Sequence, residues 1–249
     1  MAGVNPWKTV WITGASTGIG REIALMLASA GVSVAASARS ADKLAALGAS
    51  VRAYPLDVTD ADAVAETARQ IERELGPIDL AIFGAGTYAP VDVTAIRPAD
   101  FARMMSTNYQ GVVNGLAALS PRMIARGQGH ISWIASVAGY NGLPKAAAYG
   151  PTKAALINLG ESLYPEMKRL GVKISVINPG FVSTPMTAQN DFPMPFLMKP
   201  EDAARRTIAG LQSGRFEIAF PTRFAMILKL ARLLPYPLFF KLIDKAVLK

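Results

Sequence analysis

Tyr149 and Lys153 are four residues apart, the spacing that places two side chains on one face of a helix. A lysine cation close to a phenol favours the phenolate, so we expect the pKa of Tyr149 to lie below its ordinary value of about 10. A phenol whose pKa is lowered toward about 7 can exchange a proton with a carbonyl or an alcohol. The same spacing also arises by chance in surface pairs, so the hypothesis needs further residues.

Two polar residues upstream can complete such a site. Ser136 ends the segment Ile134-Ala135-Ser136, where its hydroxyl can bond a substrate oxygen and fix its orientation. Asn108 falls inside a segment with helical apolar spacing, although asparagine is a poor helix former. The presence of Asn108 in this predicted helix is explained either by a specific role in the site or by simple exposure to solvent.

A glycine-rich segment near the start reads Thr-Gly-Ala-Ser-Thr-Gly-Ile-Gly over residues 13–20. Glycines let a backbone approach a pyrophosphate closely, and the N–H groups and dipole of a following helix attract that anion. The spacing differs from the commoner Gly-x-Gly-x2-Gly fingerprint. It still predicts a phosphate cradle made by Gly14, Ser16, Thr17, Gly18, Ile19 and Gly20.

The same glycine segment also fits Gly-x-Ser-x-Gly, the nucleophile elbow of α/β hydrolases, with Ser16 as the nucleophile. A hydrolase would need an acid and then a histidine later in the chain. The sequence has one histidine, His130, at the start of a predicted strand, where a structural role is favoured. A serine hydrolase is therefore the minor alternative.

These residues need a scaffold, and short apolar runs alternate with amphipathic segments along the chain. The patterns predict helices over residues 19–30, 41–47, 61–75 (capped by Asp60), 98–125 and 149–170. They predict strands over 8–13, 32–37, 51–55, 78–83, 129–135, 172–178 and 216–220. This alternation indicates an α/β fold, a Rossmann-like doubly wound parallel sheet of about seven strands with helices on both faces. We expect one domain over residues 1–249, with the site beyond the carboxyl ends of the strands.

The ordered set of motifs resembles the short-chain dehydrogenase/reductase family over roughly residues 8–186. The resemblance rests on residues 13–20, LDV (56–58), GAG (84–86), NYQG (108–111), Ser136, YGPTK (149–153) and NPGFVST (178–184). It implies that Tyr149 is the general acid/base and that Ser136 positions the carbonyl. It further implies that Lys153 holds the nicotinamide ribose and lowers the pKa of Tyr149, and that Asn108 holds a water in a proton relay.

The same resemblance assigns cofactor contacts. Asp57 would contact the adenine beside Val58, and the small residues Gly84, Ala85 and Gly86 would let the cofactor pass. The nicotinamide and its amide would be flanked by Pro179, Gly180, Val182 and Thr184. The family usually ends its fourth strand with Asn-Asn-Ala-Gly, whereas residues 83–86 read Phe-Gly-Ala-Gly. We therefore expect different hydrogen bonding at this strand end.

The end of the second strand indicates which nicotinamide cofactor binds. An NAD enzyme carries an acid there for the adenosine ribose, and by family resemblance that position is Ala38. Arg39 follows at once, and a guanidinium can bind a ribose 2′-phosphate bidentately. Ser16 and Arg21 could assist. We therefore expect NADP(H), and carbonyl reduction as the cellular direction.

An apolar segment over residues 185–200 follows the last motif and should form the substrate wall. Its methionines and aromatic residues favour an apolar or lipid-like carbonyl or alcohol substrate, with core packing as the alternative. The large apolar residues of this segment, apart from its prolines, are Met186, Phe192, Met194, Phe196, Leu197 and Met198.

A basic, apolar extension occupies residues 222–249, in two helix-length pieces split by Pro235-Tyr236-Pro237. Neither piece has the roughly 18 apolar residues of a membrane span. An amphipathic pair lying in a membrane interface, a lid over the active site and an oligomer interface all remain open. Six cations and Asp244 give it +5 of the chain's +8 charge: Arg223, Lys229, Arg232, Lys241, Lys245 and Lys249.

Composition limits the remaining possibilities. The chain has no cysteine, which fits a reducing compartment, and residues 1–8 lack the apolar run of a secretory signal. We expect a cytoplasmic homodimer or homotetramer, with peripheral contact at the inner face of a membrane through residues 222–249 as one of the open alternatives. No metal ligand set is assigned, and no recognition motif indicates nucleic acid. A non-catalytic NADP-binding protein remains the alternative to an enzyme, although the set of Asn108, Ser136, Tyr149 and Lys153 argues against it.

Overall fold

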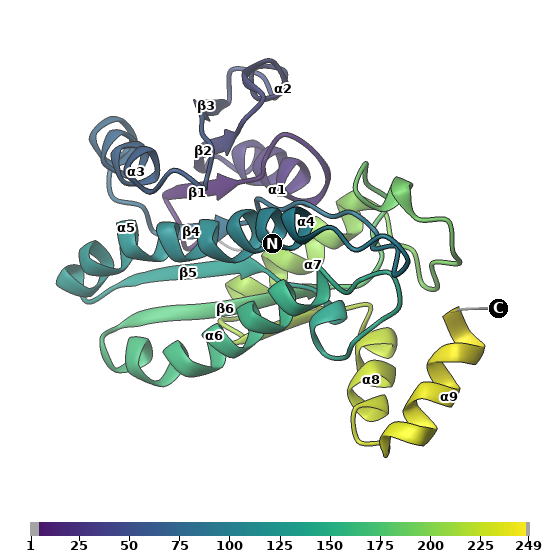
Figure 1. Ribbon diagram of the computed structural model, residues 1–249. Coiled ribbons are helices and arrows are strands. Elements are labelled where there is room, and N and C mark those ends of the chain that lie inside the picture. Colours follow the sequence, from purple (N-terminus) through teal and green to yellow (C-terminus); the bar gives the residue numbers. More distant parts are fainter. Residues whose placement is uncertain (1–4, 248–249) are drawn as a thin grey trace.

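A computed structural model describes residues 5–247 of the chain (Figure 1). In this part of the chain seven parallel strands form one sheet in the order β3-β2-β1-β4-β5-β6-β7. The strand order reverses between β1 and β4, so the predicted Rossmann-like doubly wound sheet is confirmed. The strands are β1 (Thr9–Thr13), β2 (Ser33–Ala38), β3 (Val51–Pro55), β4 (Leu80–Phe83), β5 (Gly129–Ile134), β6 (Val172–Pro179) and β7 (Glu217–Phe220).

Helices cover both faces of the sheet (Figure 1). On one face α1 (Gly18–Ser29) packs against α7 (Pro200–Gln212) over a core that includes Ile12 and Ile23. On the other face α3 (Ala61–Leu75), α5 (Gly111–Arg126) and α6 (Gly150–Arg169) enclose Trp11, Phe83 and Trp133. All five residues of β1 are buried, because a central parallel strand is covered on both sides. The short helix α2 (Ala41–Ala45) precedes β3.

The single helix predicted over residues 98–125 is wrong in its middle. The chain forms α4 (Pro98–Met105), a π-helical turn η1 (Ser106–Gln110) and then α5. The turn contains Asn108, whose side chain bonds Thr87 and Thr152 in place of solvent. Single π turns inside helices often mark functional sites.

The strand predicted over residues 78–83 begins in the structure at Leu80, two residues later than predicted. Asp79 instead accepts hydrogen bonds from the backbone N–H groups of Lys8 (2.7 Å) and Thr9 (3.1 Å) through its carboxylate. The predicted cap of α3 is confirmed, since the Asp60 carboxylate accepts a hydrogen bond from Ala63 N at 2.9 Å.

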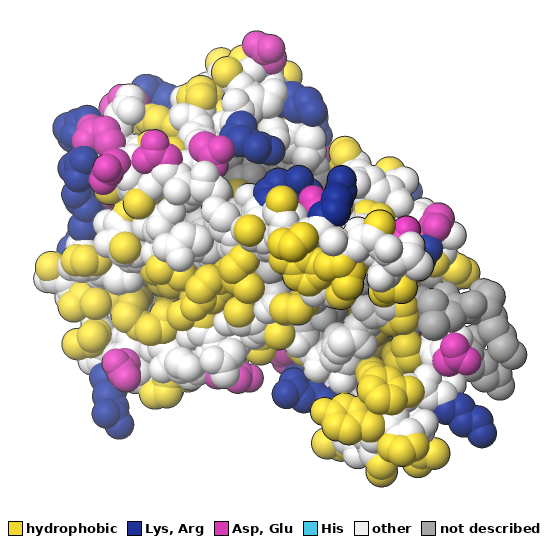
Figure 2. All heavy atoms as spheres, viewed as in Figure 1, with side chains coloured by type: hydrophobic (Ala, Val, Ile, Leu, Met, Phe, Trp, Pro, Cys, Tyr) yellow, Lys and Arg dark blue, Asp and Glu magenta, His cyan; other side chains and the backbone are white. Residues whose placement is uncertain are grey.

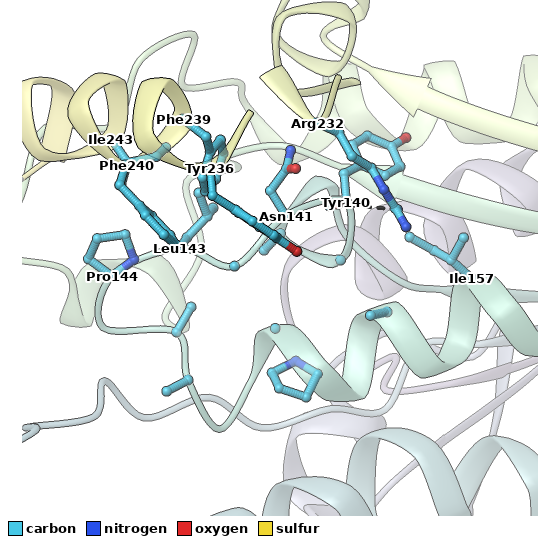
Figure 3. Close-up of a pocket in the computed structure, with 18 of the residues that line it drawn as sticks. Tyr140, Asn141, Leu143, Pro144, Ile157, Arg232, Tyr236, Phe239, Phe240 and Ile243 are labelled. Atoms are coloured by element: carbon cyan, nitrogen blue, oxygen red, sulfur yellow. Dashed lines mark hydrogen bonds between the residues drawn. The ribbon is translucent and has the colours of Figure 1, made fainter. Parts of the chain in front are cut away.

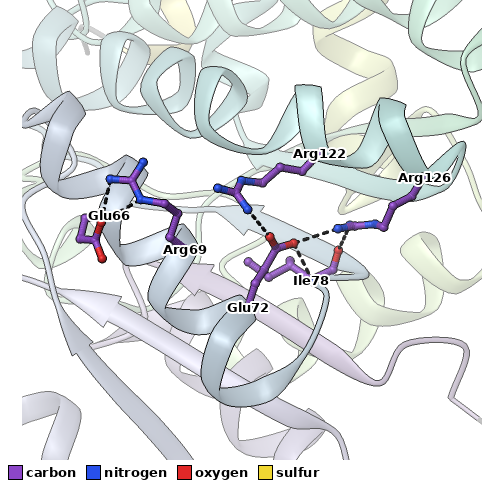
Figure 4. A network of polar contacts seen from close by, with 6 residues as sticks. All are labelled: Glu66, Arg69, Glu72, Ile78, Arg122 and Arg126. Carbon is purple, nitrogen blue, oxygen red and sulfur yellow. Dashed lines mark hydrogen bonds and ion pairs between the residues drawn. The ribbon is translucent and has the colours of Figure 1, made fainter.

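An ion-pair network joins α3 to α5 (Figure 4). Glu72 on α3 contacts Arg122 at 2.7 Å and Arg126 at 2.9 Å, and Arg126 also donates to the carbonyl of Ile78. Burial alone would raise the pKa of Glu72, but the two guanidinium groups hold it below its usual value. The neighbouring pair of Glu66 and Arg69 lies on the exposed side of α3.

The chain ends in a helical hairpin, α8 (Thr222–Ala231) and α9 (Tyr236–Val247), which projects from the body of the molecule (Figure 1). The predicted division into two helices is confirmed, but it lies at residues 232–235, because Tyr236 and Pro237 already belong to α9. The Pro235 carbonyl accepts hydrogen bonds from the N–H groups of Leu238 and Phe239. Residues 248 and 249 of the predicted extension lie outside the described residues. Over residues 5–247 no helix is sufficiently long and apolar to span a bilayer.

Candidate active site

The glycine loop between β1 and α1 is held by backbone contacts. Gly14 has a φ of +73°, and a Cβ there would lie 2.5 Å from the carbonyl oxygen of Gly84. Its N–H donates to the carbonyl of Ser37 at 2.8 Å, which ties the loop to the end of β2. Gly18 has a φ of +58°, and a Cβ there would lie 2.9 Å from Thr184 Cγ2. The loop therefore requires glycine at both positions.

The start of α1 is suited to an anion. Thr17 is its N-cap residue, and no side-chain capping bond from Thr17 is present among the described contacts. The first N–H groups of α1 therefore face the loop formed by residues 14–20, together with the positive end of the helix dipole. Ile19 is half-buried there. This geometry fits the pyrophosphate of a dinucleotide.

The end of β4 is stabilised by Thr13 on the adjacent strand. The Thr13 hydroxyl accepts hydrogen bonds from the N–H groups of Gly84 (3.2 Å) and Ala85 (3.3 Å). A Cβ on Gly84 would lie 3.0 Å from Ile134 Cδ1 and from the Thr13 carbonyl oxygen. The hydrogen bonding at this strand end therefore differs from the family pattern as expected, because the Thr13 hydroxyl bonds the backbone there. A side chain on residue 84 would be crowded.

Arg39 and Asp57 lie at the ends of neighbouring strands and are both exposed to solvent. Asp57 accepts hydrogen bonds from Thr59 N at 3.0 Å and Thr59 Oγ1 at 2.8 Å. These bonds, and to a smaller degree the charge of Arg39, hold the pKa of Asp57 below its usual value. Arg21, the weaker candidate, is paired with Glu22. Arg39 thus presents a guanidinium at the edge where the cofactor was predicted.

Asn108 clamps two parts of the site. Its Oδ1 accepts a hydrogen bond from Thr87 N at 2.7 Å, and its Nδ2 donates to Thr87 O at 3.0 Å and to Thr152 Oγ1 at 3.1 Å. The side chain therefore joins the segment after β4 to the first turn of α6. A Cβ on Gly86 would lie 3.3 Å from Asn108 Oδ1, so a small residue is needed beside it.

Ser136, Tyr149 and Lys153 meet beyond the carboxyl ends of β5 and β6. The Ser136 hydroxyl accepts a hydrogen bond from Ala138 N at 3.1 Å and donates to the carbonyl of Pro179 at 3.3 Å. Lys153 is buried, donates to the carbonyl of Ile134 at 2.7 Å, and holds its Nζ 5.4 Å from the centre of the Tyr149 ring. The predicted grouping of these three residues is therefore present.

The predicted lowering of the Tyr149 pKa is wrong for this structure. Burial raises the pKa of Tyr149 to about 12, and the opposing hydrogen bond with Ser136 is weaker. Burial also lowers the pKa of Lys153 to about 7. Both groups favour their neutral forms because both are withdrawn from water. The phenol therefore keeps its proton at neutral pH.

Tyr149 and Ser136 lie at an apolar pocket of about 280 Å³. Tyr88 packs edge-on against the Tyr149 ring with centroids 5.3 Å apart. Phe181 stacks on Phe224 of α8 at 5.7 Å and contacts Phe192 at 6.0 Å. Aromatic side chains thus form much of the wall around the hydroxyl groups.

The predicted substrate segment contributes only in part. Met186 and Phe192 line the pocket, whereas Phe196 and Leu197 are exposed. Met198 returns to the sheet side, exchanging backbone hydrogen bonds with Phe181 and Ser183. Val182 is buried and pairs with Met198, and Thr184 is bonded to Thr187 of the short helix η3 (Thr187–Gln189).

The hairpin supplies wall residues that no sequence motif marked. The pocket is also lined by Ile227, Leu228, Ala231, Leu242 and Ile243. The apolar spacing of residues 222–249 is the signal that could have located them, but that pattern does not specify what the helices face. This placement agrees with the lid alternative, and the membrane and assembly alternatives stay open.

A polar cluster that the sequence did not indicate anchors α8. Glu217 on β7 accepts hydrogen bonds from Tyr140 Oη at 2.7 Å and Asn178 Nδ2 at 3.0 Å, and pairs with Lys229 of α8. Burial would raise the pKa of Glu217, but these partners hold it below its usual value. Tyr140 follows η2 (Val137–Gly139), the short helix after Ser136, so the cluster links α8 to the catalytic region.

A larger groove of about 1060 Å³ lies between α9 and the segment after Tyr140 (Figure 3). Its lining includes Phe239, Phe240 and Arg232 but neither Ser136 nor Tyr149. Arg232 donates to the carbonyl of Tyr140 at 3.3 Å, and Asn141 donates to the carbonyl of Leu228 at 2.6 Å. The groove therefore lies beside the reactive hydroxyl groups and does not contain them.

The serine hydrolase alternative is wrong. His130 pairs in register with Leu80 at the amino end of the sheet, whereas Ser16 follows the carboxyl end of β1. His130 is buried and its Nε2 lies 2.8 Å from Ser175 Oγ. Burial lowers its pKa to about 4, as expected of a neutral structural histidine.

Known proteins resemble this chain in sequence and in fold. A family model described as short chain dehydrogenase matches residues 8–193. An uncharacterised oxidoreductase of Myxococcus xanthus is 38% identical over 240 residues, which cover 94% of this chain and 95% of the relative. A short-chain dehydrogenase structure from Streptomyces avermitilis has a TM-score of 0.80 at 25% identity, covering 91% of this chain and 92% of that one. A Burkholderia cenocepacia short chain dehydrogenase, solved in complex with NADP, has a TM-score of 0.83 at 24% identity, covering 94% and 96%.

Proposed function

The chain belongs to the short-chain dehydrogenase family of oxidoreductases, and from this premise we propose that it reduces the carbonyl group of an apolar substrate with NADPH. The observation that carries the proposal is a protonated Tyr149 hydroxyl beside Ser136 at the wall of an apolar pocket. A carbonyl oxygen placed there could meet two hydroxyl donors at once. The proposal treats the chain as one NADP-binding catalytic domain.

The chemistry follows from the state of these side chains. NADPH, when bound, supplies a hydride to the carbonyl carbon. Tyr149 gives its phenolic proton to the carbonyl oxygen, so that the product is an alcohol, which is secondary where the substrate is a ketone. Ser136 donates a hydrogen bond to the same oxygen and fixes its position. Reduction needs the phenol as an acid, and a phenol whose pKa is raised to about 12 keeps its proton at neutral pH until a nearby positive charge lowers that pKa.

Asn108 and Lys153 would support the reaction without bonding the carbonyl oxygen themselves. Lys153 would hold the nicotinamide ribose, and its pKa of about 7 means that a nearby negative charge is needed to keep it fully protonated. The developing phenolate of Tyr149 is such a charge, and the attraction between the two would lower the phenol pKa during the reaction. Asn108 would support a proton relay through the clamp that it forms between Thr87 and Thr152.

The residues at the carboxyl edge of the sheet fit a dinucleotide. Gly14, Ser16, Thr17, Gly18, Ile19 and Gly20 would hold the pyrophosphate. Asp57 and Val58 would flank the adenine, and Gly84, Ala85 and Gly86 would border its path. The nicotinamide would lie against Tyr149, Lys153, Pro179, Gly180, Val182 and Thr184. The crowding at Gly14 and Gly84, where a Cβ would contact backbone atoms of the neighbouring segment, keeps the loop and the end of β4 close together and so supports this fit.

Preference for NADPH over NADH rests on Arg39. It is exposed at the end of β2, next to Ala38, where an acid would repel a 2′-phosphate. A guanidinium can bind such a phosphate with two parallel hydrogen bonds. Arg39 and Asp57 lie at the ends of neighbouring strands, which supports a place for the guanidinium near the proposed adenosine site.

We further propose a cytoplasmic homodimer or homotetramer. Apolar side chains gather over α5 and α6 on one face of the molecule (Figure 2), which supports burial of that face in an assembly. The absence of cysteine from the sequence supports a reducing compartment. Light scattering of the purified protein measures the assembly directly.

The decisive experiment measures oxidation of NADPH by the purified protein with a panel of ketones and aldehydes of medium and long chain length. The proposal expects turnover that rises with the apolar character of the substrate. A protein that binds NADPH tightly but turns over no member of the panel would support the non-catalytic alternative.

A further inference from the structure

The α8–α9 hairpin exposes an apolar surface to solvent, part of which lines the groove of Figure 3 through Tyr236 and Phe240. Its most exposed members are Leu233, with 79% of its surface accessible, and Tyr236, with 74%. We define the hairpin tip as residues 230–240, which also expose Leu230, Leu234, Leu238 and Phe240. The tip projects away from the sheet (Figure 1), and Figure 2 shows its apolar side chains as one cluster.

The inner side of the same hairpin borders the catalytic pocket. Ile227 on α8 and Leu242 on α9 each line the pocket that holds Tyr149, yet both are about half exposed. They therefore mark a mouth that opens between the two helices. Because both residues are exposed on the hairpin and also line the pocket, they connect its exposed apolar surface with the pocket that Tyr149 lines.

The charges around the tip favour one occupant. Arg223, Arg232 and Lys241 are exposed on the hairpin, and Asp244 is the acid that its sequence carries. Figure 2 shows basic side chains on two sides of the apolar cluster. The core of a protein–protein interface is depleted in charged residues, whereas cations interspersed with exposed leucines and aromatics suit an anionic membrane surface.

We propose that the hairpin tip binds the surface of an anionic membrane, and that a membrane-dissolved carbonyl substrate reaches Tyr149 through the mouth between α8 and α9. The first part stands on the exposed surface and its charge. The second part rests on the proposed reductase function. The substrate class is an amphiphile with a carbonyl group on a long hydrocarbon chain, which moves from lipid to pocket without passing through water.

The membrane part is tested by sedimentation with vesicles of phosphatidylcholine, with and without phosphatidylglycerol. Leu233→Asp places a charge at the tip without touching the pocket lining. Leu170→Asp makes the same charge change at an exposed leucine directly after α6, near the amino end of β6, whereas the hairpin follows the carboxyl end of β7. We expect the wild-type protein to sediment with phosphatidylglycerol vesicles at low salt and to dissociate at high salt.

Leu233→Asp should lower the partition onto these vesicles by about tenfold or more, the factor that one buried leucine is worth. Leu170→Asp should bind like the wild-type protein. The proposal is overturned if the full chain does not sediment with phosphatidylglycerol vesicles at low salt, or if both variants lose binding equally. A fall in oligomer mass for Leu233→Asp, with no vesicle binding by the wild type, would assign the tip to a second copy of the chain and also overturn it.

The entry part is tested by the NADPH-dependent reduction of a long-chain ketone carried in phosphatidylglycerol vesicles and of a short, water-soluble ketone. Leu233→Asp should raise KM for the vesicle-borne ketone several-fold and leave the short ketone unchanged. Equal KM values for wild type and Leu233→Asp on the vesicle-borne ketone would overturn membrane entry. Vesicle binding without reduction of either ketone would overturn the reductase function and leave the membrane surface supported by the sedimentation result.

Discussion

The glycine loop after β1 and the α8–α9 hairpin both border the reaction site, but different contacts hold them. The loop is fixed by backbone groups, such as the bond from Gly14 N to Ser37 O, and by positions where a Cβ would strike main-chain atoms. The hairpin is fixed by a few side chains. Leu228 and Ala225 pack near Tyr140, and Lys229 pairs with Glu217.

This difference suits the glycine loop and the hairpin to two different tasks, holding the cofactor and admitting the substrate. Backbone contacts tolerate little change, so the loop can hold a cofactor in one position relative to Tyr149. A helix held by a few side chains at the molecular surface can open or shift at low cost, which suits the passage of a bulky apolar substrate. The two regions should therefore respond differently to substitution.

Tyr149→Phe should give the largest effect. Loss of the phenolic proton should reduce turnover by about a hundredfold or more, because positioned acid catalysis contributes at least that factor. NADPH binding, measured by fluorescence titration, should change little, because the loop and the strand ends hold the cofactor. Retained turnover would show that another group supplies the proton.

Arg39→Ala should give the next largest effect, and only on the cofactor side. A charge-assisted hydrogen bond is worth about 1.5–3 kcal/mol, so Kd for NADPH should rise roughly tenfold to a hundredfold. Kd for NADH should change much less, and addition of Ala38→Asp should favour NADH. An equal rise for both cofactors would mean that Arg39 does not contact the 2′-phosphate.

Glu217→Gln should act on the hairpin side. The change leaves Lys229 without its carboxylate, so we expect the free energy of unfolding to fall by roughly 2 kcal/mol. KM for a long-chain ketone should rise several-fold, while Kd for NADPH stays constant.

Glu72→Gln is the matched control, because it removes a carboxylate from an ion-pair network between α3 and α5 (Figure 4). It should lower stability in the same denaturation assay without a change in KM. A similar rise in KM for both variants would mean that Glu217 acts through global stability alone.

His130 should give the smallest effect on KM and on Kd for the cofactor, and so should not distinguish the two regions. Its pKa is lowered from 6.5 to about 4, so between these values the unfolded chain binds a proton that the folded chain does not. Stability should therefore fall as the pH falls from about 6.5 toward 4, by at most about 1.4 kcal/mol per pH unit. In His130→Gln this part of the pH dependence, measured by denaturation at several pH values, should disappear.

The alternation of apolar runs was sufficient to predict the doubly wound sheet and the order of elements as far as β6, but it did not predict helix α7 before β7. Periodicity reports which face of an element is buried, and parallel crossovers leave few topologies open. The π turn at Asn108 was not predictable from pattern, because it depends on contacts with Thr87 and Thr152 that are distant in sequence. Likewise nothing local to Glu217 indicates that Tyr140, Asn178 and Lys229 converge on it.

By itself, the sequence determined the glycine loop, the strand ends and the grouping of Ser136, Tyr149 and Lys153. Local spacing on helices and strands places these groups, and the parallel sheet brings strand ends together. Only the tertiary structure decided the ionisation of Tyr149 and Lys153, because burial outweighs their proximity. It alone also decided that the hairpin faces the pocket, since an amphipathic pattern specifies an apolar face but not its partner.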